Sequence, residues 1–171
     1  EDHRHGIVHC QITRADQLEK IAKMHLHVYA QSIFLDYDNH IVEERVGKEL
    51  ASTSYSWKTL MNNGVSVSNG TDCPVELPDA LACMRALSQE QRCATTSART
   101  AGSEIHRTGL DSYTIRSAEA SFEENVKGQI AEGMMADFVV LGQNPFEVDE
   151  STIKDIPVCR TYLGGELVYE A

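Results

Sequence analysis

Apolar positions in the first part of the chain recur with the alternating periods of strands and helices. Residues 6–12 form an apolar run too short for a helix, and residues 25–31 alternate and carry β-formers, so both predict strands. Between them, the apolar side chains of residues 13–24 fall on one helical face. Thr13 and Asp16 at its start resemble a capping box. Strand, helix and strand in this order indicate two parallel strands joined by a right-handed crossover.

The next stretch predicts a longer βα repeat of the same kind. Residues 32–40 are rich in aromatic and acidic side chains and predict an irregular loop. Apolar side chains in residues 42–61 then recur at helical steps, which indicates one long amphipathic helix or two short ones, ended by Asn-Asn-Gly at 62–64. A third strand begins at Val65, and Pro78 stands where the following helix would start.

The periodic signal fades in residues 89–108, which predict a long loop or a disordered segment. Asp111 then stands where it could cap a helix that runs to about residue 122. Beyond residue 125 the pattern changes to four short strands, at residues 126–130, 137–141, 158–163 and 166–169. The last two flank Gly164-Gly165, a two-residue hairpin turn. The pattern therefore predicts a βα unit over residues 1–122 and a small β-rich module over residues 123–171.

Composition narrows the class of partner more than the class of reaction. The chain is 42% hydrophobic and 24% charged, as in an ordinary globular protein, and its net charge is −11. Without a run of Lys or Arg, neither nucleic acid nor an anionic membrane is expected as the main partner. No apolar run approaches the roughly 18 residues that a membrane span needs. Five cysteines without CxxC spacing indicate free thiols in a reducing compartment, so we expect a cytoplasmic location.

Two side chains near predicted strand ends could carry chemistry. His9 falls near the end of the first strand and Asp72 near the end of the third, so in a parallel barrel both would point into one mouth. Imidazole and carboxylate suit Zn²⁺ or a similar divalent ion, and a carboxylate can also transfer protons. The spacing alone favours a structural role for both, with His9 as a hydrogen-bonded core residue and Asp72 as a turn or cap residue. His25 and His27 flank the second strand as surface residues would.

Five segments of the chain together match the pattern of one family. They are residues 5–11, 31–46, 68–76, 120–128 and 136–141, and they occur in that order. They resemble the C-terminal part of amidohydrolase family 3, the branch that contains N-substituted formamide deformylases and many other metal-dependent hydrolases. The resemblance covers nearly the whole chain outside residues 89–108. The chain departs from it at Val8, where the family often has an acid, at Ser32, where it often has proline, and in the region between residues 87 and 110.

The resemblance implies a fold and a set of site residues. Residues 1–122 would form strands six to eight of a (β/α)₈ TIM barrel with their helices, and residues 123–171 would be strands of a small β-sandwich. His9 would be the metal ligand that ends strand six, and Gln31 would end strand seven and contact substrate. Asp72 would end strand eight, bind metal and shuttle the proton. The family's paired His-x-His, its strand-four ligand and its strand-five histidine would all precede Glu1.

The expected activity is hydrolysis of a non-peptide, amide-type carbon–nitrogen bond by a metal-activated water. The resemblance implies one or two divalent ions, zinc first among them, and a small-molecule amide as substrate. The chain would then be a C-terminal fragment that needs the N-terminal part of the same protein, associates with itself, and is inactive and largely metal-free alone. Two alternatives stay open. One is a non-catalytic binding or regulatory module, and the other is a hydrolase that uses Cys10 or Cys73 as its nucleophile.

Overall fold

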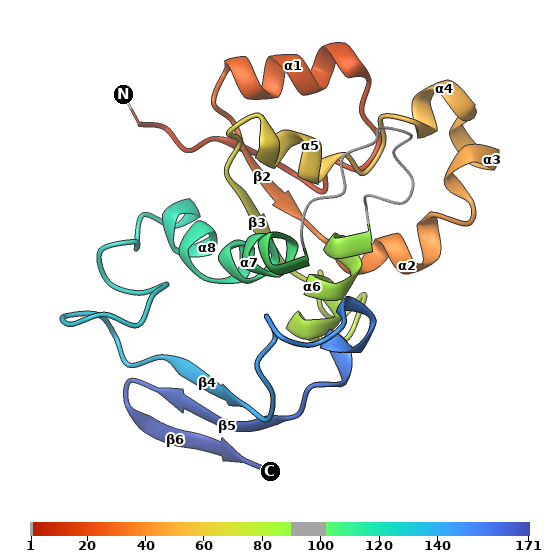
Figure 1. Cartoon of the computed structure of the whole chain (residues 1–171). Helices are drawn as coiled ribbons and strands as arrows, with labels where there is room; N and C mark the ends of the chain where they lie inside the picture. The colour runs from red at the N-terminus through yellow and green to blue at the C-terminus, as the bar shows by residue number, and fades with distance from the viewer. Residues whose placement is uncertain (1, 90–101) are drawn as a thin grey trace.

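The computed structural model describes residues 2–89 and 102–171 (Figure 1). Its first sheet contains three parallel strands in the order β1 (Gly6–Val8), β2 (His27–Ala30) and β3 (Val67–Asn69). Val8 lies opposite Tyr29 in the β1–β2 ladder. The prediction of parallel strands is therefore confirmed, although each strand is shorter than its apolar run.

Helix α1 (Ala15–Lys23) connects β1 to β2 as predicted, but its cap differs from the prediction. Arg14, not Thr13, is the N-cap residue, and its backbone N–H donates to Gln17 Oε1 at 2.9 Å. The Thr13 hydroxyl instead donates to the carbonyl oxygen of Thr53 at 2.9 Å. Because α1 begins at Ala15, the cap lies one residue later than predicted.

The segment between β2 and β3 is more helical and more broken than predicted. It contains η1 (Ser32–Phe34), α2 (Leu35–Asp38), α3 (Val42–Val46), α4 (Lys48–Ala51) and α5 (Trp57–Asn62). The predicted loop at 32–40 is thus wrong, because Leu35 packs into the core with 2% of its surface exposed and so anchors a helical turn. Gly47, at φ +83°, separates α3 from α4 and interrupts the predicted longer helix.

The core lies against the parallel sheet. Val28 and Val67 in the strands, and Trp57 and Leu60 in α5, expose at most 1% of their surface. Complete burial of such side chains stabilises a fold by roughly 1.5–3 kcal/mol each. His27 is also buried, and its Nε2 lies 3.0 Å from Ser68 Oγ, so the prediction that it lies on the surface is wrong. A cross-strand hydroxyl accounts for the difference, because it satisfies the buried imidazole.

Three helices follow β3: α6 (Ala80–Gln89), α7 (Gly102–Tyr113) and α8 (Ile115–Ala120). Helix α6 begins just after Pro78, as predicted. The predicted loop at 89–108 is wrong over residues 102–108, which are helical, while residues 90–101 lie outside the described residues. Asp111 lies inside α7 and does not start a helix. None of the described helices is long and apolar enough to cross a membrane.

A second sheet contains three antiparallel strands, β4 (Phe138–Leu141), β5 (Val158–Leu163) and β6 (Glu166–Glu170). Gly164 and Gly165 join β5 to β6 at φ +58° and +82°, which confirms the predicted hairpin. The strand predicted at 126–130 is wrong. Gly128 turns the chain there at φ +99°, and a Cβ on it would lie 2.8 Å from the Cβ of Ala118.

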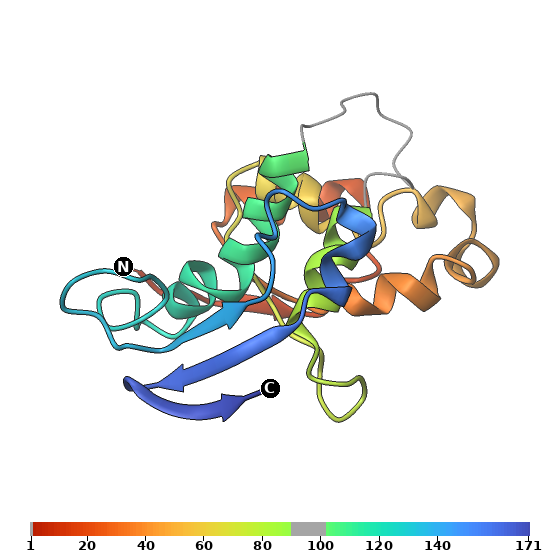
Figure 2. The same ribbon diagram turned by 60° about the horizontal axis from the view of Figure 1, so that its bottom comes forward.

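The second sheet is tied to the helices by a short element that the sequence pattern did not predict. The 3-10 helix η3 (Glu150–Asp155) packs on α6 and fully buries Ile153. Ile153 and Ile156 form a small core with Met84 of α6. In Figures 1 and 2, helices α6–α8 lie between this sheet and helices α1 and α5.

Candidate functional site

Three side chains of the predicted site stand at one edge of the parallel sheet. His9 follows β1 directly, Gln31 follows β2 directly, and Asp72 comes three residues after β3 ends. The carboxyl ends of parallel strands share an edge, so these residues gather there. The ladder continues into this edge, since the Gly70 N–H donates to the Ala30 carbonyl oxygen at 3.0 Å.

The backbone is strained where this edge carries its candidate residues. His9, Cys10 and Asp72 have φ values of +66°, +49° and +56°. A non-glycine residue held in such a conformation costs on the order of 1–3 kcal/mol, and such residues cluster at functional sites. Around His9 the strain is held by two hydrogen bonds at 2.9 Å, one from its N–H to the Tyr29 carbonyl oxygen and one to its carbonyl oxygen from Trp57 Nε1.

A single amide contact sets the chemical form of His9. Gln31 is 7% exposed, and its Nε2 donates to the Tyr29 carbonyl oxygen at 3.1 Å. Its Oε1 therefore faces His9 and lies 2.7 Å from Nδ1. An amide oxygen only accepts hydrogen bonds, so Nδ1 carries the ring proton. The other ring nitrogen, Nε2, is left with a lone pair that can bind a metal ion.

Asp72 stands at the start of an exposed loop, residues 72–80, which joins β3 to α6. Figure 2 shows this loop, in yellow-green, projecting from the body of the molecule. The Asp72 carbonyl oxygen accepts from the Val75 N–H at 2.8 Å and closes a turn. No hydrogen bond joins Asp72 to His9 or Gln31 within the described residues. The structure thus brings His9 and Gln31 into contact and places Asp72 at the same edge.

The loop of Asp72 is tied to β2 by a pair that sequence reasoning did not identify. The Ser32 N–H donates to Asn69 Oδ1 at 3.1 Å, and Asn69 Nδ2 donates to Ser32 Oγ at 2.7 Å. Ser32 Oγ in turn donates to the Cys83 carbonyl oxygen of α6 at 2.7 Å. Ser32 is fully buried. The only signal in the sequence was its place, where the family pattern often has proline.

The donors at this edge suit a divalent ion in kind but not in number. Imidazole nitrogen and carboxylate oxygen are ordinary ligands for Zn²⁺. However, no group of three or more His, Cys, Asp or Glu in the described part of the chain could hold a metal ion. His9 and Asp72 therefore provide part of a ligand set.

Of the two cysteines at this edge, Cys10 fits a nucleophilic role poorly. The four cysteines of the described ranges are free thiols, as predicted, and Cys93 lies outside those ranges. Burial raises the pKa of the Cys10 thiol to about 11, so it stays protonated at neutral pH. Cys73 is exposed and immediately follows Asp72. The interpretation of Cys10 as a nucleophile is disfavoured by this burial.

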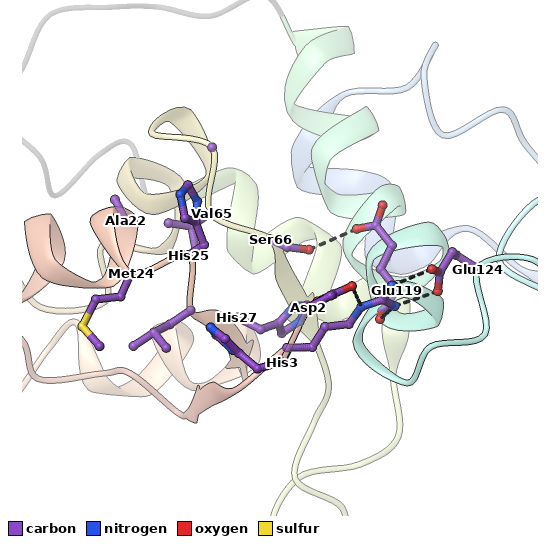
Figure 3. Close-up of a pocket in the computed structure, with 13 residues that line it drawn as sticks. Asp2, His3, Ala22, Met24, His25, His27, Val65, Ser66, Glu119 and Glu124 are labelled. Atoms are coloured by element: carbon purple, nitrogen blue, oxygen red, sulfur yellow. Dashed lines mark hydrogen bonds and ion pairs between the residues drawn. The ribbon is translucent and has the colours of Figure 1, made fainter.

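The opposite end of the same strands holds a different kind of pocket (Figure 3). It measures about 450 Å³, and its lining includes His3, His27 and Glu119. Beside them, Arg4 forms two hydrogen bonds with the Glu124 carboxylate at 2.6 and 2.7 Å. Arg4 also contacts the Glu119 carbonyl oxygen, so the start of the chain is pinned to the end of α8. At this end, therefore, charged contacts join the start of the chain to α8 and the residues after it.

Solved structures of similar shape are metal-dependent hydrolases with a mixed α/β fold. An uncharacterized metal-dependent hydrolase from Pyrococcus furiosus matches with a TM-score of 0.67 at 27% identity, over 84% of this chain and 29% of that one. A second one, from Pyrococcus horikoshii OT3, matches with a TM-score of 0.69 at 25% identity, over 86% of this chain and 30% of that one. The α/β class predicted from the sequence is confirmed at this level.

The chain belongs to the amidohydrolase family, whose model matches residues 1–169. YtcJ of Bacillus subtilis (strain 168), named as an amidohydrolase, is 31% identical over 96% of this chain and 32% of its own length. LONG AFTER FAR-RED 3 of Arabidopsis thaliana is 29% identical over 98% of this chain and 29% of its own length. An N-substituted formamide deformylase of Arthrobacter pascens matches over 36% of this chain. The chain thus spans about a third of the length of the first two curated relatives.

Proposed function

We propose that this chain carries part of the active site of a metal-dependent hydrolase that cleaves amide-type carbon–nitrogen bonds. The observation that carries the proposal is the contact between His9 Nδ1 and Gln31 Oε1 at 2.7 Å. It leaves His9 Nε2 with a lone pair at the edge where Asp72 also stands. Membership in the amidohydrolase family supports the same reaction class.

The two residues would have different tasks. His9 Nε2 and the Asp72 carboxylate would each donate to one divalent ion, with zinc favoured by this mixture of donors. Such an ion, when bound, makes a water molecule more acidic and polarises the scissile carbonyl. The Asp72 carboxylate would accept the proton of the attacking water and return it to the leaving nitrogen. In this proposal the substrate is a small molecule with an amide-type bond.

Two ligands do not complete a catalytic site, and the relatives are about three times longer than this chain. We propose that the remaining ligands come from the part of the relatives that this chain does not match. The 171 residues alone would then turn over no substrate and hold metal weakly. Val8 on β1, the edge strand, and Ile12 beyond its end are exposed by 59% and 43%, and they would contact that part in the parent protein and a second copy in the isolated chain.

The test uses the full-length parent protein and a panel of amide and formamide substrates. Asp72→Asn removes the proton acceptor, and turnover should fall on the order of 10²- to 10⁴-fold with the fold intact. Asp155→Asn, the same change at an exposed residue of η3, is the control and should leave turnover unchanged. Retained turnover in Asp72→Asn would contradict the assignment. A metal-free, inactive wild-type parent would instead favour a non-catalytic binding module.

A further inference from the structure

Gln31 and Ser32 are adjacent in sequence and reach the two halves of the site in opposite directions. They follow β2, the central strand, and expose 7% and 0% of their surface. Gln31 extends to His9 beyond β1, and Ser32 extends to Asn69 at the end of β3. Both contacts are made by uncharged, buried groups, the Gln31 amide and the Ser32 hydroxyl.

The Gln31 contact fixes a tautomer. A neutral imidazole carries its proton on either ring nitrogen, and the hydrogen bond at one nitrogen decides the state of the other. Gln31 cannot turn its amide over without losing the bond from its Nε2 to the Tyr29 carbonyl oxygen, at 3.1 Å. Its Oε1 is thereby held as an acceptor for the Nδ1 proton of His9, and His9 Nε2 is kept free of protons.

The Ser32 contact fixes a backbone turn. Asn69 Oδ1 accepts from the Ser32 N–H at 3.1 Å and from the Gly70 N–H at 3.0 Å. Ser32 Oγ bonds both Asn69 and the Cys83 carbonyl oxygen of α6, each at 2.7 Å. One serine thus bonds the last residue of β3, before the loop that carries Asp72, and the first turn of α6, after that loop. A proline at position 32 has no N–H and no hydroxyl, so it could make none of these bonds.

We infer that the carboxyl end of β2 is a positioning device, in which Gln31 sets the tautomer of His9 and Ser32, through Asn69, sets the turn that carries Asp72. The inference rests on the proposed function for its catalytic meaning. Gln31, Ser32 and Asn69 are positioning residues, because they act through His9 and Asp72. Partners of this kind typically change metal affinity or activity by 10- to 100-fold when they are lost.

The first experiment measures the tautomer directly and needs neither metal nor turnover. Histidine is labelled with ¹⁵N in the 171-residue chain, and long-range ¹H–¹⁵N spectra are recorded near pH 8.5, where imidazole is about fully neutral. His9 should show the proton on Nδ1. In Gln31→Leu, which removes the acceptor, the proton should move to Nε2 in a large part of the molecules. Gln31→Glu keeps an acceptor and should keep the Nδ1 proton.

The exposed His25 is the internal control and should give the same spectrum in all variants. An unchanged His9 tautomer in a folded Gln31→Leu chain would overturn the role of Gln31. If Gln31→Leu does not fold, Gln31→Glu decides, because loss of the Nδ1 proton in that variant would also overturn it.

The second experiment measures the turn and then the site. In Asn69→Ala, amide exchange at Ser32 should rise by about tenfold, since its N–H loses its acceptor, whereas the Gly70 N–H keeps the Ala30 carbonyl oxygen as a second acceptor and should change less. Asn63→Ala removes an exposed asparagine whose side chain donates to the Thr59 carbonyl oxygen of its own helix at 2.9 Å, and should leave both amides unchanged. Unchanged exchange in Asn69→Ala would overturn the role of the pair.

In the full-length parent, Asn69→Ala and Ser32→Ala should each lower kcat on the order of 10-fold or more with KM nearly unchanged, and the double variant should be no worse than the more affected single one. Strictly additive losses would overturn the coupling. A wild-type parent without turnover would contradict the proposed function alone, because the tautomer and exchange results do not depend on catalysis.

Discussion

The two ends of the parallel sheet are built from the same three strands but from different interactions. The carboxyl end is held by neutral hydrogen bonds around His9, Gln31 and Ser32. The amino end is held by charge, with Arg4 paired to the Glu124 carboxylate at 2.6 Å. In α/β folds, the carboxyl ends of parallel strands are where the residues that do chemistry are usually displayed. In this sheet the two ends of the strands differ in the interactions that hold them.

The largest change in stability should come from Trp57, the residue that packs beneath the carboxyl end of β1 and bonds His9. Trp57 is fully buried, and its Nε1 donates to the His9 carbonyl oxygen at 2.9 Å. Trp57→Ala should lower the free energy of unfolding by about 3–5 kcal/mol, because it opens a cavity and removes the bond. Trp57→Phe keeps most of the ring and should cost less, about 1–3 kcal/mol. Urea titration of both variants measures the two costs, and a Trp57→Phe chain as stable as the wild type would contradict the role of the indole N–H.

Replacement of Asp72, whose backbone has a positive φ, should change the free energy of unfolding in the opposite direction. Glycine tolerates positive φ, so Asp72→Gly should raise the free energy of unfolding by about 0.5–1 kcal/mol while it removes the proposed proton acceptor. The matched change Asp16→Gly, in the first turn of helix α1, should lower stability instead. Thermal unfolding of both variants checks the pair. A loss of stability in Asp72→Gly would mean that the carboxylate stabilises its own turn.

A third effect distinguishes the ends by pH. Burial lowers the pKa of His27 below its ordinary 6.5, so the unfolded chain accepts a proton that the folded chain resists. The unfolded state binds more protons below that value, and stability should therefore fall as the pH drops below 6.5. His27→Gln should flatten this part of the stability curve, and His25→Gln, at an exposed site, should not. A curve unchanged in His27→Gln would contradict the assignment.

The smallest effect should come from the ion pair of the amino end. The hydrogen bond from Arg4 is the main cause that lowers the pKa of Glu124 from 4.5 to about 2. A carboxyl with a lowered pKa stabilises the fold above its unfolded value, so its contribution should be lost as the pH falls from 4.5 towards 2. Glu124→Gln should remove this slope, whereas the exposed Glu132→Gln should keep it. Unfolding midpoints across this range, at low salt, make the measurement.

The fold was predictable where periodicity and turn chemistry agreed. The three parallel strands, α1 and the Gly164-Gly165 hairpin follow from apolar period and glycine position. Helix α7 was missed because its sequence is rich in Gly, Ser and Thr, which have low helix propensity. Its packing overrides that propensity. Gly109 of α7 faces Met84 of α6, where even an added Cβ would make an ordinary contact at 3.4 Å.

The candidate site was predictable in its residues but not in its supports. His9 and Asp72 stand out because they come at strand ends and match a family pattern. The orientation of the Gln31 amide and the Ser32–Asn69 pair depend on distances between strands, which no periodicity contains. The serine in place of proline was a visible departure. The consequence of this serine could not be predicted from the sequence, because the acceptor of its backbone N–H, Asn69 Oδ1, lies on another strand.

Helix α6 connects the C-terminal strands to the carboxyl end of the parallel sheet. The Cys83 carbonyl oxygen of α6 accepts a hydrogen bond from Ser32 Oγ, and the next residue, Met84, packs against Ile153 and Ile156. The helix is thus clamped between the candidate site on one side and the link to the second sheet on the other. A truncation before residue 143 would look like the removal of an accessory sheet. It would also remove Ile153 and Ile156, which pack on Met84, and so destabilise helix α6, where the Asp72 loop ends.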